Sequence, residues 1–383
     1  MRIGIVAAEP SGDALAAGLM RALREELPTV RFEGVSGPRM LEAGIDSWES
    51  MDSLSVMGLF EVLRHLPRLL RLRRGLLRRW EDTPPALFIG VDAPDFNLAV
   101  ETHLRERGVP TVHYVSPTVW AWRTGRVRKI RRAADLLLTI LPFEKDFLAG
   151  YGVAAHYVGH PLAGQMTLSP DRAAARRELD LVADAPTLAL LPGSRHGEVS
   201  RLAGPFIEAA QSLRASIPDL QVVTPLVRDD TREQFEAQCL ARAPSLPVRV
   251  VTGQSHAALA AADVVLVASG TATLEALLSH RPMVVGYRVN AATYAVVRAL
   301  RLIKTRHVAL SNLLSEEPMA EELIQDDCVP EKLAPALLSL FRDPARRDAI
   351  AARYHAVLER LRMDSNREAA RAVRELLREH GVA

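Results

Sequence analysis

The chain has 383 residues, of which 48% are hydrophobic, with a formal net charge of +2 and two cysteines. This length suits two domains, each with its own core, and the near-neutral charge gives no indication of a nucleic-acid partner. Two cysteines exclude a disulfide scaffold and a cysteine-built metal site. The N-terminal apolar stretch is too short for a signal peptide, and the sequence has no run of about 18 apolar residues that would span a membrane. We therefore expect a cytoplasmic protein.

Short runs of branched apolar residues alternate with helical patterns along most of the chain. The expected strands are 2–7, 86–91, 110–115 and 135–140, and then, after a polar stretch near 165–172, 187–193, 220–225, 247–251, 263–268 and 282–287. Such alternation, with nearly continuous apolar strands, indicates parallel sheets covered on both faces. We therefore predict an α/β protein with two Rossmann-like, doubly wound domains facing a cleft, at 1–168 and 169–345, followed by C-terminal helices at 346–383.

Ligands of open parallel sheets bind beyond the carboxyl ends of the strands, so the loops there are the candidate sites. The first loop, "VAAEPSGDALA" (6–16), lacks the three-glycine dinucleotide fingerprint, which argues against an NAD enzyme. We expect Ser11 to cap the following helix and Gly12 to let a substrate approach the backbone. Packing does not explain Glu9 at the strand end.

The segment 56–80 carries seven arginines and one glutamate, and more leucines than one buried stripe requires. This pattern favours a helical segment at an anionic membrane surface, and a core-packing helix with a solvated face is the alternative. We expect Pro67 to start a second helix. The residues expected to face the membrane are Leu59, Phe60, Leu63, Leu66, Leu69, Leu70, Arg68 and Arg71.

The loop "IGVDAPDFNLAVE" (89–101) places Asp92 and Asp95 directly after a buried strand and at the start of a helix. Asp92 stands where a general base of this fold would stand, but an aspartate that caps the helix is an equally good explanation. Asp92 and Asp95 together make a magnesium site conceivable, although the local spacing supplies no third oxygen ligand. The sequence leaves these alternatives open.

Two loops of the second half have the features of an anion site. In "LLPGSRHGEV" (190–199), Arg195 begins a helix, where the dipole disfavours a cation unless an anion such as a diphosphate is bound; a plain solvated arginine is the alternative. In "VASGTATLEALL" (267–278), Ser269, Gly270 and Thr271 leave the helix N-terminus open to a phosphate. Glu275, one turn later, is placed to accept hydrogen bonds from a ribose diol, and a capped helix with a surface glutamate is the alternative.

Taken together, motifs along almost the whole chain resemble those of the lipid-A-disaccharide synthase family. The matching segments are "AAEPSGD" (7–13), "GVSGPRM" (34–40), "MGLFEVL" (57–63), "GVDAPDFN" (90–97), "HYVSPTVWAWR" (113–123), "LPFE" (141–144), "VGHP" (158–161), "LLPGSR" (190–195) and "SGTATLE" (269–275). The segment with two tryptophans is the most specific, whereas "SGTATLE" is shared more widely among two-domain nucleotide-sugar enzymes.

The resemblance implies the two-domain glycosyltransferase fold called GT-B, with the C-terminal helices packing back on the first domain. It implies an inverting transfer of 2,3-diacylglucosamine from its UDP conjugate to 2,3-diacylglucosamine 1-phosphate (lipid X), which forms the lipid A disaccharide 1-phosphate and UDP without metal or cofactor. It also implies a peripheral position on the cytoplasmic face of the inner membrane. The sequence does not indicate the oligomeric state.

The resemblance also assigns roles to residues. Asp92 corresponds to the proposed catalytic base, and the basic segment to a membrane-facing surface. We expect donor binding by Gly193, Ser194, Arg195, Ser269, Gly270, Thr271, Glu275 and Asn312, and acceptor binding by Glu9, Ser11, Gly12, Asp95 and His113. The chain departs from the usual pattern at Ala8, Pro10, Ser36 and Ser311, and none of these changes removes a charged group.

Two rival functions remain at this point. Another two-domain UDP-sugar enzyme, such as an epimerase or a different lipid glycosyltransferase, would share the phosphate-binding turn but would not need segment 56–80. A scaffold protein at the inner membrane would not need Asp92, Arg195 and Glu275 to be intact.

Overall fold

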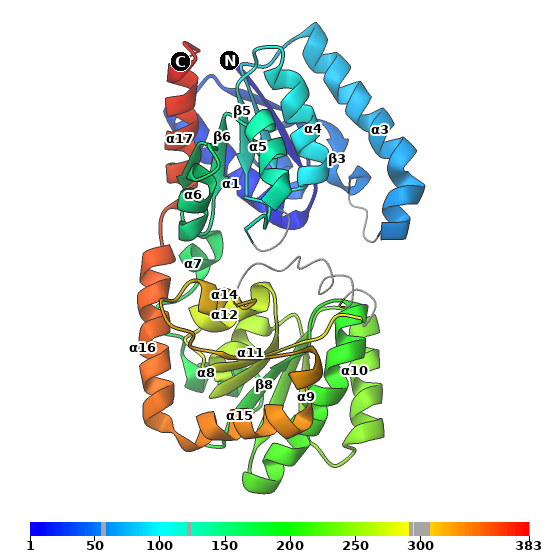
Figure 1. The fold of residues 1–383 in the computed structure, drawn as a ribbon, viewed down its shortest axis with the longest axis vertical. Coiled ribbons are helices and arrows are strands. Elements are labelled where there is room, and N and C mark those ends of the chain that lie inside the picture. Colours follow the sequence, from blue (N-terminus) through cyan, green and yellow to red (C-terminus); the bar gives the residue numbers. More distant parts are fainter. Residues whose placement is uncertain (55–58, 121–123, 291–293, 295–306, 383) are drawn as a thin grey trace. The chain divides into compact units, whose positions relative to one another are not determined.

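The computed structural model describes residues 1–54, 59–120, 124–290, 294 and 307–382, with only the backbone at 59–65 and 124. The chain forms two compact units (Figure 1). Unit 1 consists of Met1–Gly164 and Leu361–Ala383, and unit 2 of Gln165–Arg360. The sequence predicted divisions at 168 and 345, with the helices of 346–383 packing on the first domain. In the structure α16 (Pro344–Leu361) belongs almost entirely to unit 2, and α17 (Ser365–Glu379) to unit 1.

Unit 1 is built on a seven-stranded parallel sheet with the order β3-β2-β1-β4-β5-β6-β7. Its strands are β1 (Arg2–Ala7), β2 (Arg31–Ser36), β3 (Asp46–Ser50), β4 (Leu87–Val91), β5 (Thr111–Tyr114), β6 (Leu136–Thr139) and β7 (Ala155–Tyr157). Its helices are α1 (Pro10–Glu26), α2 (Pro38–Glu42), α3 (Leu59–Asp82), α4 (Pro94–Arg105), α5 (Val127–Ala133), α6 (Pro142–Ala149), α7 (Pro161–Gln165) and α17 (Ser365–Glu379).

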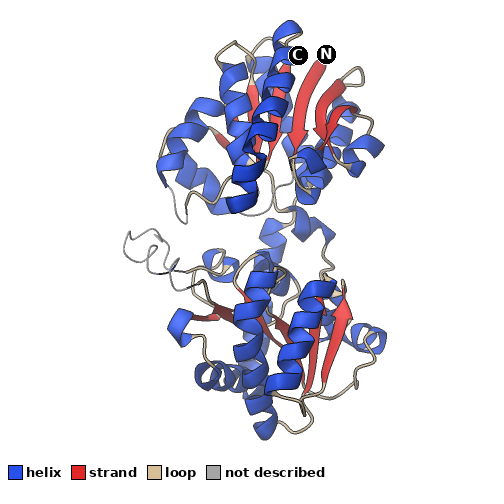
Figure 2. Ribbon diagram, turned by 90° about the vertical axis from the view of Figure 1, so that its right-hand side faces the viewer, coloured by secondary structure: helices blue, strands red, loops and turns tan. Residues whose placement is uncertain are grey.

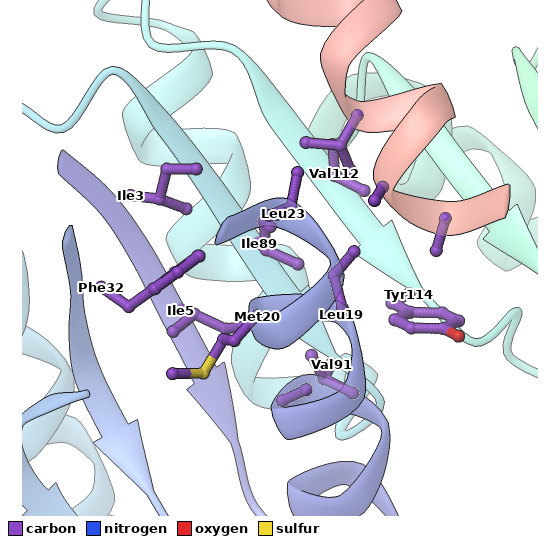
Figure 3. Packing of buried hydrophobic residues seen from close by; sticks show 14 of the residues in the cluster. Ile3, Ile5, Leu19, Met20, Leu23, Phe32, Ile89, Val91, Val112 and Tyr114 are labelled. Carbon is purple, nitrogen blue, oxygen red and sulfur yellow. The ribbon is translucent and has the colours of Figure 1, made fainter. Parts of the chain in front are cut away.

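The core of unit 1 has two faces because the strand side chains alternate across the sheet. On one face, Ile3, Ile5 and Ile89 pack under α1 and α17 (Figure 3). On the other, Phe88 packs with Trp80 of α3 and with residues of α4. The strand β4 is buried along its whole length, which explains its uninterrupted apolar sequence.

Unit 2 repeats the architecture of a sheet flanked by helices (Figure 2). Its six-stranded parallel sheet has the order β10-β9-β8-β11-β12-β13. Its strands are β8 (Thr187–Leu191), β9 (Gln221–Leu226), β10 (Val248–Thr252), β11 (Val264–Ala268), β12 (Met283–Tyr287) and β13 (Glu321–Ile324). Its helices are α8 (Arg172–Glu178), α9 (His196–Ser216), α10 (Asp229–Arg242), α11 (Ser255–Ala261), α12 (Thr271–Leu278), α14 (Leu310–Leu313), α15 (Pro330–Arg342) and α16 (Pro344–Leu361).

These two sheets confirm the predicted α/β class, and all nine predicted strands are present within two residues of their expected ends. Four strands, β2, β3, β7 and β13, were not predicted. Three of them lie at sheet edges, where the side chains are less buried and the sequence is correspondingly less apolar. The fourth, β2, is interrupted by Glu33 and Gly34.

Segment 56–80 differs from its prediction in one respect. Pro67 lies inside the single helix α3 and does not start a second helix. A proline within a helix removes one backbone hydrogen bond and crowds the preceding turn. The second half of α3 is nevertheless anchored to unit 1, because Leu76 and Trp80 are buried in its core.

Candidate active site

The loop after β4 has an unusual backbone. The Asp92 N–H continues the sheet by donating to the Tyr114 carbonyl at 2.8 Å, but Asp92 and Ala93 then take φ values of 51° and 43°. Ala93, and not Asp92, is the N-cap residue of α4, and no side chain caps that helix. The helix-cap explanation of Asp92 is therefore not supported by the structure, and its carboxylate accepts no hydrogen bond from the described residues.

A buried amide holds this loop in place. Asn97, on the first turn of α4, is fully buried, and its Nδ2 lies 2.8 Å from the carbonyl oxygen of Asp92, 3.2 Å from that of Val91 and 3.4 Å from that of Val6. It thus joins the carboxyl ends of β4 and β1. Two consecutive left-handed residues other than glycine are costly, and Asn97 is the contact that stabilises them.

The end of the neighbouring strand is strained as well. Val115 follows β5 with a φ of 77°, a genuine outlier for a β-branched residue, and its N–H donates to the Leu138 carbonyl at 3.0 Å. Asp92 and Val115 thus lie at the ends of paired strands. Backbone strain of this kind tends to cluster at functional sites.

These two strand ends enclose a pocket of about 300 Å³, at the small end of the range for small-molecule sites. Its walls combine charged, hydroxyl and apolar side chains, namely Asp92, Arg126, Ser116, Thr118, Pro94, Val115, Pro117 and Val119. The pocket therefore places one carboxylate and one guanidinium in a confined space that is otherwise largely apolar.

Asp95 lies at the first turn of α4, and its carboxylate Oδ1 is 2.9 Å from Nη2 of Arg126. The Asp95 side chain is 86% exposed and that of Arg126 28% exposed. Asp95 thus forms an exposed ion pair with a cation of the protein. Among the described residues, no group of three or more histidine, cysteine, aspartate or glutamate side chains is arranged to hold a metal ion.

His113 does not line this pocket. It lies beneath α4, fully buried, with its Nδ1 at 2.6 Å from Oε1 of the equally buried Glu101. Burial raises the pKa of Glu101, although His113 opposes this shift. The pair occupies the space that a side chain at Gly90 would fill, since a Cβ there would lie 2.1 Å from Glu101 Oε1.

The far wall of the pocket is supported by Glu144 at the start of α6. Its carboxylate accepts hydrogen bonds from the Leu141 N–H and from Nε1 of Trp120, both at 3.1 Å. Glu144 is almost completely buried, and this burial raises its pKa to about 7 in spite of those hydrogen bonds. The buried acid links α6 to the loop that contains Ser116. Residues 121–123 of the two-tryptophan motif lie outside the described residues.

The first loop lies at the adjacent strand end, because Ala7 of β1 pairs with Val91 of β4. Glu9 and Ser11 are exposed, and Glu9, not Ser11, is the N-cap residue of α1. Gly12 is buried against Val91. A Cβ at this position would lie 3.5 Å from Val91 Cγ1, an ordinary contact distance, so packing against β4 does not by itself require a glycine.

In unit 2, the loop after β8 is held by a carboxylate. Glu198 Oε2 accepts the N–H of Ser194 at 3.1 Å and that of Arg195 at 3.4 Å. Gly193, with a φ of 113°, leaves room for this carboxylate, because a Cβ there would lie 2.5 Å from it. Arg195 is 78% exposed, and its Nη1 is 3.6 Å from Glu198 Oε1, so this arginine has an anionic neighbour within the protein while its guanidinium stays accessible.

The turn after β11, which the sequence predicts to bind a phosphate, lies next to this loop because β11 pairs with β8. Gly270 is the exposed N-cap residue of α12, with a φ of 153°, and Thr271 is exposed as the first helical residue. Ser269 is tied down by a hydrogen bond from its Oγ to the Val308 carbonyl at 3.1 Å. Glu275 is half-buried, and burial raises its pKa while the nearby His256 opposes this shift.

Asn312 is buried and fully hydrogen-bonded. Its Nδ2 donates to the Ala320 carbonyl at 2.8 Å and to Glu322 Oε1 at 2.7 Å, while its Oδ1 accepts from the N–H groups of Met319 and Ala320. The donor contact expected of Asn312 is therefore not available in this structure, because all its polar valences are used within unit 2. Glu322 also accepts the Val308 N–H at 2.9 Å.

The expected membrane-facing residues fall on the first half of α3. Leu66 is 42% exposed, and Leu69 and Leu70 are half-buried. Arg71 is exposed, and exposed Arg68 donates from Nη2 to Ser53 Oγ at 3.1 Å. The side chains of Leu59, Phe60 and Leu63 lie outside the described residues. No helix in the described part of the chain is long and apolar enough to cross a bilayer.

Several residues of these sites were not identified from the sequence. Asn97, Val115 and Glu144 lay inside motifs that were noted, but their buried contacts have no local signature. Arg126 lies three residues beyond the two-tryptophan motif in a run of basic residues, which hid it. Glu198 follows Arg195 by three residues, and that spacing of a glutamate behind a helix start is a recognisable capping signal.

Solved structures show the fold. A UDP-GlcNAc 2-epimerase from Neisseria meningitidis bound to UDP-GlcNAc superposes with a TM-score of 0.60 at 12% identity, covering 99% of this chain and 100% of that chain. A glycosyltransferase from Rickettsia africae ESF-5 gives 0.59 at 9% identity, covering 99% and 98%. The chain shares with them the GT-B arrangement of two parallel-sheet units.

Sequence relatives are far more similar. The lipid-A-disaccharide synthase of Sodalis glossinidius (strain morsitans) is 50% identical over 375 residues, which cover 98% of each chain. That of Xanthomonas campestris pv. campestris (strain 8004) is 50% identical over 386 residues, covering 100% of this chain and 88% of the relative. The family model described as lipid-A-disaccharide synthetase matches residues 3–376. Because the family model and relatives of 50% identity match nearly its whole length, the chain belongs to the lipid-A-disaccharide synthetase family.

Proposed function

We propose that unit 1 binds and activates the acceptor and that unit 2 binds the UDP-sugar donor, in the reaction that joins two diacylated glucosamines. Membership of the family makes the chain a glycosyltransferase of lipid A biosynthesis. The donor is UDP-2,3-diacylglucosamine, the acceptor is 2,3-diacylglucosamine 1-phosphate, and the products are the lipid A disaccharide 1-phosphate and UDP. An epimerase function, the rival of the same fold, is not favoured by these relatives.

In this proposal Asp92 is the general base. Its carboxylate takes the proton of the acceptor 6-hydroxyl as that oxygen attacks the anomeric carbon of the donor, and the bond from this carbon to the UDP oxygen breaks with inversion. The observation that carries the assignment is the position of Asp92 on a strained turn in a pocket, where it does not cap the helix. General bases of this kind contribute roughly 10²–10⁴-fold to the rate.

The departing UDP carries away negative charge, which unit 2 is equipped to receive. Arg195 offers an exposed guanidinium beside the N–H groups at Ser194, and Gly270 and Thr271 leave the N-terminus of α12 open. Cations and helix N-termini of this kind stabilise a diphosphate. Half-buried Glu275 is placed one turn behind them, and we assign to it the ribose hydroxyls.

We further propose that α3 places unit 1 on an anionic membrane surface, where both diacylated substrates reside. Leu66, Leu69 and Leu70 are incompletely buried, and arginines flank them. Apolar side chains beside arginines favour a headgroup region of negative charge. The enzyme would then work on the cytoplasmic face of the inner membrane as a peripheral protein.

The reaction is tested by measuring UDP release with and without the acceptor. We expect release only when the diacylated glucosamine phosphate is present. The Asp92→Asn variant should lower kcat by about 10²–10⁴-fold and leave UDP binding by calorimetry unchanged. A variant with near-normal kcat would contradict the role of Asp92 as the base.

Membrane association is tested with vesicles that contain anionic lipid. The double variant Leu69→Ser/Leu70→Ser should sediment less with such vesicles, and Leu240→Ser, at a leucine of unit 2 that is 75% exposed, should behave like the wild type. Thermal unfolding distinguishes a membrane-facing helix from a core-packing helix. If the double variant sediments like the wild type but is much less stable, α3 is a core-packing helix.

A further inference from the structure

The pocket beside Asp92 contains a cation that the proposed reaction does not yet use. Arg126 and Asp92 are the charged residues among the described side chains that line it. Deprotonation of a hydroxyl by Asp92 needs no guanidinium, and the diphosphate of the donor is assigned to Arg195 and α12 in unit 2. Arg126 therefore calls for another anion, one that belongs to the acceptor.

Folding does not account for this arginine. Arg126 is the N-cap residue of α5, a position where the helix dipole disfavours a positive charge. The helix itself adds further cations, including Arg128 and Arg131. Arg128 and Arg131 line the neighbouring groove, so among the described residues Arg126 is the cation that faces Asp92 in this pocket.

The one described ion pair of Arg126 is easily exchanged. Asp95 contacts only Nη2, and its carboxylate is 86% exposed, so water competes for it and the pair is weak. Nε and Nη1 have no partner among the described residues. A guanidinium with donors left over can bind a phosphate through two parallel hydrogen bonds, while Asp95 limits its motion.

We propose that Arg126 binds the phosphate group of the acceptor and thereby positions the sugar with its hydroxyl toward Asp92. The inference rests on the proposed function, since it assigns one end of the acceptor to each charged wall of the same pocket. It makes Arg126 a determinant of specificity: the enzyme would select a sugar phosphate over the same sugar without phosphate. A site built around a charged contact rejects an analogue that lacks it.

The test compares two acceptors in two enzymes by kcat/KM: the diacylated glucosamine 1-phosphate and its dephosphorylated analogue, each with the wild type and with Arg126→Ala. For the wild type, loss of the phosphate should lower kcat/KM by about 10- to 100-fold. Arg126→Ala should cause a similar loss with the phosphorylated acceptor and almost no further loss with the analogue. Arg126→Lys should restore part of the discrimination, because it keeps the charge.

Arg128→Ala is the matched control, since Arg128 is exposed on the same helix and lines the neighbouring groove with Arg131 and Tyr151. It should retain the full discrimination between the acceptors. The proposal is overturned if Arg126→Ala discriminates as strongly as the wild type, or if this variant raises the KM of the UDP-sugar and leaves that of the acceptor unchanged. Absence of UDP release by the wild type with either acceptor would instead refute the proposed function.

Discussion

The carboxyl edges of the two sheets hold their loops by different means. In unit 1 a neutral amide, Asn97, binds the strand-end carbonyls and keeps Asp92 and Ala93 in a left-handed backbone. In unit 2 carboxylates hold the loops: Glu198 accepts hydrogen bonds from the N–H groups of Ser194 and Arg195, and Glu322 accepts one from the N–H of Val308.

The difference follows from what each edge has to do. A carboxylate anchor would place a second negative charge close to Asp92, whereas an amide anchors the loop without adding charge. At the other edge, Glu198 occupies N–H groups at the N-terminus of α9 that an anionic ligand would use, so a bound diphosphate competes with it. In unit 1 an internal amide thus fixes the loop of the proposed base, whereas in unit 2 an internal carboxylate holds the loop of the arginine proposed to bind the diphosphate.

The largest effect expected from this comparison is that of Arg195→Ala. If the exposed guanidinium stabilises the leaving diphosphate, kcat should fall by about 10²–10³-fold, measured as the rate of UDP release at saturating acceptor. Arg228→Ala is the control, because Arg228 is also an exposed N-cap arginine of unit 2, at the start of α10. An equal loss of kcat in Arg195→Ala and Arg228→Ala would show that Arg195 has no special role in stabilising the leaving group.

The variant Asn97→Ala tests whether the loop of Asp92 in unit 1 needs its amide anchor. Without the amide, the carbonyls of Val91 and Asp92 lose their partner and the base can move, so kcat should fall by about 10²-fold and stability by about 1–3 kcal/mol. Urea unfolding measures the second effect. Thr102→Ala on the same helix removes only a hydrogen bond to the Leu98 carbonyl one turn away and should be nearly neutral. An Asn97→Ala enzyme with normal kcat would show that the strained turn does not need its anchor.

Glu144→Gln tests the buried acid of unit 1, which has a pKa of about 7 against an ordinary value of 4.5. Because the folded chain holds the proton more tightly than the unfolded chain, this group stabilises the fold fully below about pH 4.5. That stabilisation is lost as the pH rises through 7, by up to about 3 kcal/mol. The variant cannot titrate, so its free energy of unfolding relative to wild type should rise between pH 5 and 8; a constant difference would mean that Glu144 ionises normally.

Gly90→Ala tests the packing beneath the loop of Asp92, and its effect should be confined to stability. A Cβ would meet Glu101 Oε1 and Asn97 in the packed layer beneath the base, and overpacking of this kind costs about 1–3 kcal/mol. Gly75→Ala in α3 meets no atom within 4 Å and should stabilise the helix by up to about 1 kcal/mol. Chemical denaturation of both variants decides whether the layer is as tight as the distances indicate.

The sequence predicted the sheets well because buried parallel strands such as β4, β8 and β11 are apolar along their whole length. It also predicted which strand ends carry polar residues. It could not predict contacts between distant elements, such as the hydrogen bond between Glu144 and Trp120 or the ion pair of Asp95 with Arg126. For the same reason Asn312 and His113 were assigned to ligands, although the structure shows both engaged inside the protein.

The position of helix α17 has a consequence for how the chain folds during its synthesis. Val373 and Leu377 of this helix belong to the same core as Ile3 and Ile5 of β1, so β1 is covered by a helix that is synthesised much later. Domains usually fold in the order of their synthesis, but here the middle of the chain can close first. Nascent unit 1 must therefore keep an apolar face uncovered until translation has passed residue 379.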